Sequence, residues 1–330
     1  MRLLKRLLFI LLSAVLLASA WLAWFASKPL ALRVSPLDFD IPAGMGLRAA
    51  AQHMSQTGLG FSAWQFTLLA RLAGKSGEIK AGSYEVNQGL TPWLLLGKLT
   101  RGDVTQTEIA LVEGKTFKQW RDELDADPEV RHDTEGLSGA DIMARIGADE
   151  NYPEGLFFPD TYLFAKNSSD LDILKRAYLA MQRHLAAEWQ RRNPGLPYTT
   201  PYQALIMASI IEKETGRPSD RPQVAAVFVN RLRLGMPLQT DPTVIYGAGT
   251  QLQGGLLKRS LQIDTPYNTY TRDGLPPTPI AMPGLASLQA ALHPSASPML
   301  YFVARGDGSS QFSRTLDEHN RAVAKYLKGK

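Results

Sequence analysis

The sequence contains no cysteine among its 330 residues. This absence excludes thiol catalysis, thiolate zinc sites and a disulfide scaffold. It does not identify the compartment, because a protein of this size can fold in an oxidising space without disulfides. Histidine is scarce as well, and the five histidines are scattered and form no H-E-x-x-H zinc motif. We therefore expect neither a metal nor a cofactor.

The sequence also lacks internal repeats, low-complexity tracts and a basic helix or Lys/Arg stripe of the kind that binds nucleic acid. Its net charge of +5 suits an anionic surface such as membrane lipid or an acidic polymer. With 45% hydrophobic and 20% charged residues the composition is globular. The length predicts a short extra segment plus two compact parts, and no nucleic-acid partner is expected.

Charge is missing from the 21 residues between Arg6 and Lys28. Such a stretch is long enough for a helix to cross a hydrocarbon core of about 30 Å. Trp21, Trp24 and Phe25 cluster at its far end, where amphipathic rings favour the interface. The pattern predicts a transmembrane helix.

Three basic residues, Arg2, Lys5 and Arg6, precede this stretch, which places the N-terminus in the cytoplasm and residues 29–330 outside it. A cleaved signal peptide is the alternative, since Ala18–Ala20 reads A-S-A. The anchor is favoured because the apolar stretch exceeds the usual h-region of about 7 to 15 residues.

The next part of the chain predicts a small α+β module. A first strand follows the prolines at 29 and 36, two helices with a turn at Q-T-G-L-G lie between Gly46 and Leu72, and "AGSYEVNQG" reads as a second strand. "TPWLLLGKLTRGD" then begins a helix with Thr91 as cap and Pro92 at its first position. Such a module is either a spacer or a polymer-binding unit.

Residues 111–200 give a less regular pattern. A helix is expected to open at Thr116, and residues 125–150, acidic and glycine-containing, predict a variable surface insertion. "YPEGLFFPDTYLF" suits a rigid aromatic wall more than a regular element. Leu171–Arg192 predicts one long amphipathic helix.

The run from Tyr202 to Thr215 contains "IMASIIEKET" and has no glycine or proline. Apolar residues cover nearly its whole circumference, so the helix should be buried on most sides. Two carboxylates, Glu212 and Glu214, follow in the last turn and point roughly 200° apart on a helix of 3.6 residues per turn. They must therefore meet different surroundings.

Glu214 continues the stripe of Ile210 and Ile211 and should be partly desolvated, which disfavours its charged form and suits a general acid. Glu212 lies over smaller residues and should meet solvent or a basic partner, Arg217 or Arg221. On spacing alone, a capping or salt-bridged carboxylate remains the alternative for both.

A second apolar helix ends at Gly235 and is followed by a polar loop with Asp241, Thr243 and Tyr246. "TPYNTYTRDGLPPTPIAMPG" is an extended loop whose prolines stiffen it. Its Asn, Thr and Tyr side chains suit sugars, although an ordinary surface turn is the alternative. "LYFVARGDGSSQFS" predicts a hairpin, and Thr315 with Glu318 predicts a capping box on the final helix.

Several of these segments in order resemble one family. They are "EGLFFPDTYLF", "ASIIEKET", "VFVNRLRLGMPLQTDPTVIYG", "YNTYTRDGLPPTPIAMPG" and "LYFVARGDG". Together they resemble the YceG-like endolytic murein transglycosylases, also called the MltG family, and the resemblance is densest after residue 154. It implies an α+β protein with a transmembrane anchor at 1–30, a LysM-like subdomain at 31–110 and a catalytic domain at 111–330 that contains a buried catalytic helix.

The resemblance also implies the reaction. The family's catalytic glutamate is the second of E-K-E-T and corresponds to Glu214. It would cleave the bond between N-acetylmuramic acid and N-acetylglucosamine in nascent glycan strands and leave a 1,6-anhydro end, which terminates strand elongation. Asp241, Asn268 and Tyr270 are the expected sugar contacts, and Glu212 is the second candidate carboxylate.

The implied location is the inner membrane, with one span, a cytoplasmic N-terminus and a periplasmic catalytic domain. Peptidoglycan strands are the implied partner, with cell-wall synthases such as penicillin-binding proteins as further candidates. Two other functions stay open: a glycoside hydrolase with Glu214 as acid and Asp241 as base, and an anchored peptidoglycan-binding scaffold without activity.

Overall fold

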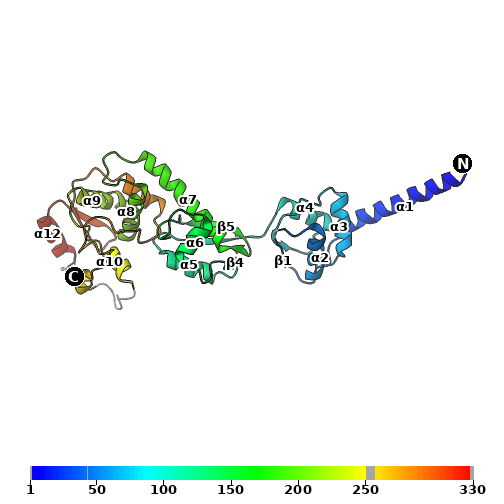
Figure 1. Cartoon of the computed structure of the whole chain (residues 1–330), viewed down its shortest axis with the longest axis horizontal. Helices are drawn as coiled ribbons and strands as arrows, with labels where there is room; N and C mark the ends of the chain where they lie inside the picture. Colours follow the sequence, from blue (N-terminus) through cyan, green and yellow to red (C-terminus); the bar gives the residue numbers. More distant parts are fainter. Residues whose placement is uncertain (1, 43, 250–256, 328–330) are drawn as a thin grey trace. The chain divides into compact units, whose positions relative to one another are not determined.

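The computed structural model describes residues 2–42, 44–249 and 257–327, and the chain is a mixed α+β protein (Figure 1). It divides into two compact units. Unit 1 comprises Met1–Glu108 with Glu129–Arg131 and Leu163–Ser168. Unit 2 comprises Ile109–Pro128, His132–Tyr162 and Ser169–Lys330.

Unit 1 has the strand, helix, helix, strand, helix order that the sequence predicts after the first apolar segment. Its elements are α1 (Arg2–Ser27), β1 (Leu37–Ile41), α2 (Leu47–Thr57), α3 (Ala63–Leu72), β2 (Gly82–Val86) and α4 (Pro92–Arg101). The two strands pair antiparallel, with Leu37 opposite Val86 and Ile41 opposite Gly82. Thr91 caps α4 as expected, because its hydroxyl accepts the Leu94 N–H at 3.3 Å.

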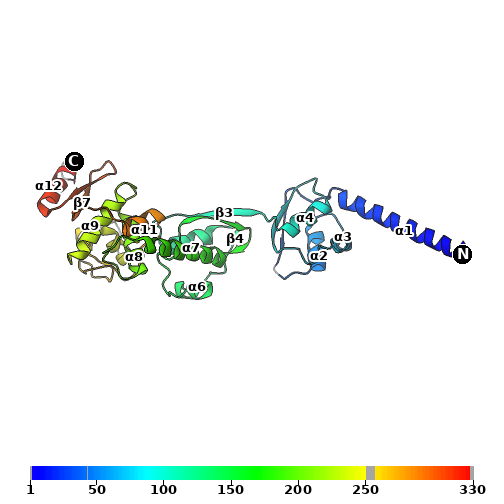
Figure 2. The ribbon, with the colours of Figure 1, turned by 90° about the horizontal axis from the view of Figure 1, so that it is seen from above.

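Helix α1 is long and apolar enough to cross a membrane, and its most apolar part is not buried by the protein. Only its last turns pack on unit 1, where Phe25 is buried and Trp21 stacks on Trp64 with ring centroids 5.3 Å apart. Phe25 joins a core that also contains Phe39, Met54, Phe66, Tyr84 and Leu95. Both ribbon views show the start of α1 standing clear of the other elements of this unit (Figures 1 and 2).

The later elements are mostly helical. They are β3 (Gln106–Leu111), α5 (Phe117–Ala126), β4 (Val130–Arg131), α6 (Gly139–Ile146), β5 (Asp160–Ala165), β6 (Ser168–Ser169), α7 (Asp170–Arg191), α8 (Pro201–Glu214), α9 (Arg221–Arg233), α10 (Asp241–Ala248), η2 (Lys258–Gln262), α11 (Leu285–Leu292), β7 (Tyr301–Ala304), β8 (Ser310–Ser313) and α12 (Leu316–Leu327). Strands pair two by two, as β3–β5, β4–β6 and β7–β8. The predicted hairpin is β7–β8, in which Tyr301 lies opposite Ser313.

Helix α8 is the buried element of unit 2, as its composition predicts. Every residue from Ala204 to Ile211 is buried. The Thr200 hydroxyl accepts the Gln203 N–H at 3.2 Å and Pro201 occupies the first turn, so the helix begins at a defined point. Helices α7, α9, α10 and α11 contact it, and Figure 2 shows α9 and α11 beside it. Its C-terminal turn is therefore held in place.

Three expectations about local structure are wrong. The segment "YPEGLFFPDTYLF", expected as a wall without regular structure, contains the start of strand β5 (Asp160–Ala165). Residues 125–150 do not form a surface insertion, because α6 packs on α7 and buries Ile142, Met143 and Ile146. The segment expected as a polar loop at Asp241 forms helix α10, since Asp and Pro occupy the first turn, where both are favoured. For α6 and α10 the reason is the same: turn-forming residues at the ends of a short helix read as loop signals in the sequence.

Two fully buried serines provide a test of how α8 is held. The Ser209 hydroxyl donates to the Ile206 carbonyl at 2.7 Å and accepts the Ile280 N–H at 3.0 Å. The Ser287 hydroxyl on α11 has no partner within the described residues. Ser209→Ala leaves the buried Ile280 N–H without an acceptor and should lower the free energy of unfolding by about 1–3 kcal/mol. Ser287→Ala removes a hydroxyl that has no such partner and should leave the free energy of unfolding unchanged or raise it. Denaturant unfolding of the full chain in detergent measures both, and equal losses would contradict the assignment.

Candidate active site

Glu214 ends helix α8 and enters a pocket of about 450 Å³ in unit 2. The pocket walls come from α9, α10, β7, α12 and the loops before α10 and after η2. The lining residues are Glu214, Phe228, Arg231, Leu238, Gln239, Asp241, Tyr270, Tyr301, Phe302, Leu316, His319 and Asn320. One carboxyl group thus leaves an apolar helix and meets a polar and aromatic cavity.

Thr240 fixes one oxygen of this carboxyl group. Its hydroxyl donates to Glu214 Oε1, and its own N–H donates to the Thr269 hydroxyl at 3.1 Å. Thr240 and Thr269 are both buried, so the donor is itself immobilised. This arrangement leaves Oε2 as the oxygen available to a ligand.

Burial raises the pKa of Glu214 from its ordinary value of 4.5 to about 7. The Thr240 hydrogen bond and the Arg231 charge lower this pKa, while the negative charge of Asp241 raises it. Burial is the largest of these effects. A substantial fraction of Glu214 therefore carries a proton at neutral pH, as a general acid requires.

The structure brings Asp241 and Tyr270 into the pocket beside Glu214. The Tyr270 hydroxyl donates to Asp241 Oδ1 at 2.5 Å. Burial, the hydrogen bond to Asp241 and the nearby carboxylates all raise the pKa of Tyr270, so its hydroxyl stays protonated. These two residues form one hydrogen-bonding unit on the pocket wall.

Asn268 lies behind this wall and is fully buried. Its amide donates to the carbonyls of Leu261 and Ile263 at 3.0 and 2.7 Å, and its Oδ1 accepts the Tyr270 N–H at 2.8 Å. Asn268 therefore folds the loop and positions Tyr270, and it does not line the pocket.

Glu212 faces another part of unit 2, as the 200° separation predicts. Its Oε1 accepts from Arg221 at 3.2 Å, and its Oε2 accepts the Gly284 N–H at 2.9 Å. The side chain is only 5% exposed, so of the two expected surroundings, solvent or a basic partner, the structure shows the basic partner Arg221. Glu212 joins α8 to the start of α9 and to the residue before α11.

Arg231 is a pocket residue that sequence reasoning missed. It is buried, its Nε donates to the Leu300 carbonyl and its Nη1 to the Leu238 carbonyl, both at 2.8 Å, and it lies 5.1 Å from the Tyr301 ring. Nothing in "NRLRLG" distinguishes it from Arg233, which donates to the Gly195 carbonyl. The guanidinium therefore joins α9 to Leu300, directly before β7, and to the loop before α10.

A separate group has metal-ligand chemistry. Donor atoms of Asp125, His132 and Asp170 lie within 4.8 Å of one another. The Asp170 carboxylate is already engaged, because it accepts from the Thr134 N–H, the Thr134 hydroxyl and the Leu171 N–H. The group therefore gives no reason to assign a metal.

Comparison with known proteins identifies relatives over most of the chain. The model of the YceG-like family matches residues 39–325. An endolytic murein transglycosylase from Bacillus subtilis is 33% identical over 311 residues, which cover 89% of this chain and 86% of that protein. An endolytic murein transglycosylase from Streptococcus pneumoniae is 26% identical over 327 residues, which cover 88% of this chain and 58% of the longer relative.

A solved structure shares the fold. The crystal structure of a YceG-like protein from Listeria monocytogenes has 29% sequence identity and a TM-score of 0.54. The match covers 87% of this chain and 99% of that chain.

The raised pKa of Glu214 predicts a pH-dependent stability. Because the folded state holds the proton more tightly than the unfolded state, the stabilisation is complete below about pH 4.5 and is lost as pH rises toward 7. The loss should be about 3 kcal/mol for this one group. Unfolding of the full chain from pH 5 to 8 should show that Glu214→Gln removes this part of the slope. The exposed Glu135→Gln serves as control, and a slope that Glu214→Gln leaves unchanged would contradict the assignment.

Proposed function

Because the chain belongs to the YceG-like family, we propose that it is an endolytic murein transglycosylase in which Glu214 both donates and accepts the proton. The observation that carries this proposal is a carboxyl group with a pKa of about 7 at the edge of a cavity, with one oxygen held and one oxygen available. The substrate is the glycan strand of peptidoglycan.

The first step breaks the glycosidic bond. Protonated Glu214 donates from Oε2 to the oxygen that links C1 of N-acetylmuramic acid to N-acetylglucosamine, and that oxygen leaves as a hydroxyl group. Thr240 keeps Oε1 in place, so the acid cannot rotate away. Arg231 provides a nearby positive charge when Glu214 becomes a carboxylate.

The second step closes a ring within the product. The Glu214 carboxylate accepts the proton of the muramic C6 hydroxyl while that oxygen bonds to C1. The proton count is restored, no water is consumed and a 1,6-anhydro end forms. One carboxyl group is sufficient because the nucleophile belongs to the substrate, whereas ordinary glycosidases use a carboxylate pair.

Asp241 and Tyr270 contact the sugar from the pocket wall. Their hydrogen bond leaves the second Asp241 oxygen to accept from a sugar hydroxyl, and the negative charge favours a transition state with positive character. Asn268 acts through Tyr270, whose backbone it holds. Glu212 remains the second candidate carboxylate, although its pairing with Arg221 supports a structural role.

The proposal includes the location of the enzyme. Helix α1 within residues 1–30 anchors the chain in the inner membrane by one span, with the N-terminus in the cytoplasm and the rest in the periplasm. The basic residues before the apolar segment support this orientation. Residues 31–110 form a LysM-like, glycan-binding subdomain and 111–330 the catalytic domain. Cell-wall synthases are the proposed protein partners, and strand termination is the proposed role.

A hydrolase is the second candidate, and the presence of Asp241 in the same pocket favours it. In that reaction Glu214 would act as the acid and Asp241 would activate a water molecule as the base. The products differ in mass, because hydrolysis adds one water to each cut and ring closure adds none.

Substitution of Glu214 tests the proposed role directly. Glu214→Gln should lower the cleavage rate about 10²- to 10⁴-fold, since the amide can neither donate nor accept this proton. Full-length protein in detergent is incubated with purified peptidoglycan, and the muropeptides are analysed by liquid chromatography and mass spectrometry. Wild type and the Glu135→Gln control should release anhydro ends. Reducing ends would indicate hydrolysis, and full activity in Glu214→Gln would refute the assignment.

Asp241→Asn should shift the pH dependence of kcat/KM to lower pH. The rate depends on protonated Glu214, so kcat/KM should fall as pH rises through about 7. Asparagine keeps an acceptor for Tyr270 but removes the charge that raises the Glu214 pKa, so the decline should begin at lower pH. A steady-state pH series measures the shift. A decline at unchanged or higher pH would contradict it, and complete loss of activity at every pH would favour the hydrolase.

A further inference from the structure

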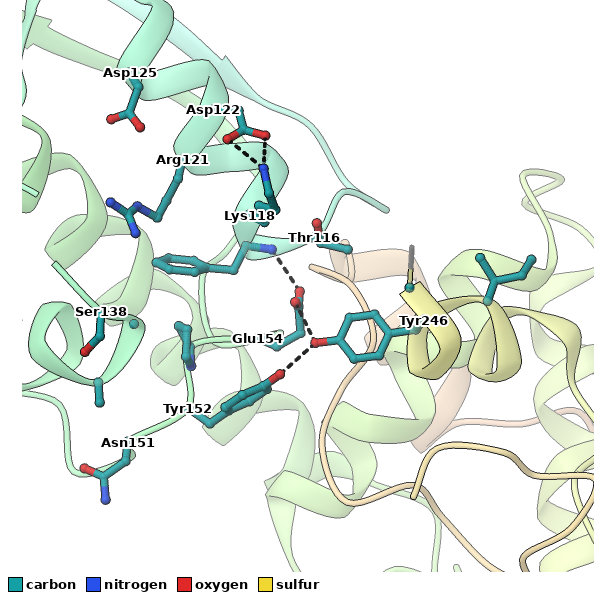
Figure 3. Close-up of a pocket in the computed structure, with 16 residues that line it drawn as sticks. Thr116, Lys118, Arg121, Asp122, Asp125, Ser138, Asn151, Tyr152, Glu154 and Tyr246 are labelled. Carbon is teal, nitrogen blue, oxygen red and sulfur yellow. Dashed lines mark hydrogen bonds and ion pairs between the residues drawn. The ribbon is translucent and has the colours of Figure 1, made fainter. Parts of the chain in front are cut away.

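A second, larger cavity in unit 2 is not used by the mechanism. Its volume is about 970 Å³. Its walls come from one side of α5 along its length, the start of α6, the segment 151–154 and the second half of α10, and Figure 3 shows these side chains around the cavity. The residues that carry the argument are Lys118, Arg121, Tyr152, Glu154, Ile245 and Tyr246.

Glu154 is the buried polar group of this cavity, with 4% of its surface exposed. Its Oε1 accepts the Phe117 N–H at the first residue of α5, and its Oε2 accepts the Tyr246 hydroxyl, both at 3.0 Å. The Tyr246 and Tyr152 hydroxyls are also 3.0 Å apart (Figure 3). Tyr152 is 45% exposed, so a chain of hydrogen bonds leads from a buried carboxyl group to the open cavity.

Burial raises the pKa of Glu154 from 4.5 to about 7, although the bonds from Phe117 and Tyr246 lower it. The carboxyl group can therefore exist as a neutral acid near neutral pH. In its neutral form Glu154 adds no charge to the cavity. The hydrogen-bonded network that begins at Glu154 ends at the Tyr152 hydroxyl, which faces the open cavity.

The charges of the cavity favour an uncharged ligand. Lys118 is paired with Asp122 at 2.9 Å. Arg121 donates to the carbonyls of Leu137 and Thr134 at 3.0 and 2.9 Å. The carbonyl oxygens do not cancel the charge of Arg121, but Asp122 and Asp125 place two carboxylates in the lining beside the two cations. These four charges balance, so the lining favours no net charge of either sign in a ligand.

The remaining lining has the character of a sugar site. The Tyr152 and Tyr246 rings and the exposed Ile245 side chain provide apolar surface. Because Tyr246 donates to Glu154, the Tyr152 hydroxyl donates to Tyr246 and keeps its lone pairs to accept from a ligand. A sugar ring with one apolar face and a rim of hydroxyl and amide groups matches the apolar surface and the hydrogen-bonding group of this lining. An uncharged N-acetylated hexosamine has this chemistry.

Helix α10 connects this cavity to the Glu214 pocket. Asp241 in its first turn lines the pocket of Glu214, whereas Ile245 and Tyr246 line the second cavity. Five residues of helix correspond to a rise of about 7.5 Å. The helix is tightly packed, because a Cβ at Gly247 would lie 2.5 Å from Thr265 Oγ1 and 2.8 Å from Tyr267 Cβ. A polymer can therefore contact both ends of one rigid helix.

We propose that the cavity beside Glu154 binds an uncharged N-acetylated hexosamine unit of the glycan strand, away from the bond that Glu214 cleaves. The proposal rests on the proposed function and extends it. A sugar site away from the cleaved bond selects strands that continue beyond that bond. It contributes binding free energy that a short fragment cannot supply.

The first experiment measures binding without cleavage. Full-length Glu214→Gln is titrated with a hexamer of N-acetylglucosamine by isothermal calorimetry. Addition of Tyr152→Ala should weaken binding about tenfold, and Tyr152→Phe should weaken it less, because only the hydroxyl is lost. Leu179→Ala is the matched control, since Leu179 on α7 is 44% exposed and outside the cavity. Equal affinities in all variants would overturn the proposal.

The second experiment separates this proposal from the proposed function. With Glu214 intact, Tyr152→Ala should raise KM for long strands about tenfold while kcat changes little. If wild type releases no anhydro ends but Tyr152→Ala still weakens hexamer binding, the sugar site stands and the transglycosylase assignment falls. If wild type cleaves and Tyr152→Ala matches Leu179→Ala in both KM and binding, the sugar site is refuted and the enzyme assignment stands.

Discussion

Burial of helix α8 on nearly every side is the constraint on which the site depends. A helix that is apolar all round must be enclosed by other elements, and α7, α9, α10 and α11 enclose this one. Its last turn therefore places Glu214 and Glu212 on opposite sides with little freedom. One carboxyl group reaches a cavity and has its pKa raised to about 7, while the other is paired with Arg221. Two chemically identical side chains thus acquire different surroundings from the face of the helix that each occupies.

Hydrogen bonds fix the side chains that apolar packing brings to the Glu214 pocket. Thr240 holds the acid, Tyr270 holds Asp241, and Asn268 holds the loop that carries Tyr270. Arg231 secures two backbone segments and leaves its charge beside the acid. Each of these groups is positioned by a partner that is itself buried or bonded, which is how a site retains its geometry when a polymer binds. Helix α10 carries both Asp241 and Tyr246, so the Glu214 pocket and the proposed sugar site share one wall.

The sequence was sufficient to predict α8, the separation of its two glutamates and the order of elements in unit 1, because each depends on local periodicity and caps. It also indicated Asp241 and Tyr270, whose residue types suit sugars. It did not reveal helix α10 or the packing of α6, since Asp, Pro and Gly at their ends read as loop signals. Arg231 and Thr240 act through backbone carbonyls and a buried hydroxyl, which have no sequence pattern. The Glu154 cavity joins Phe117, Tyr152 and Tyr246 from distant parts of the chain, and only the fold brings them together.

The central claim is that the enclosing helices keep Glu214 protonated near neutral pH. Carbon-13 NMR of full-length protein labelled at the glutamate side-chain carboxyl carbons tests it most directly, with Glu214→Gln used to assign the resonance. The account predicts that the resonance absent from Glu214→Gln titrates near pH 7. A resonance that titrates near the ordinary value of 4.5 would show that the carboxyl group is already ionised at neutral pH, and the single-residue acid–base mechanism would then be wrong.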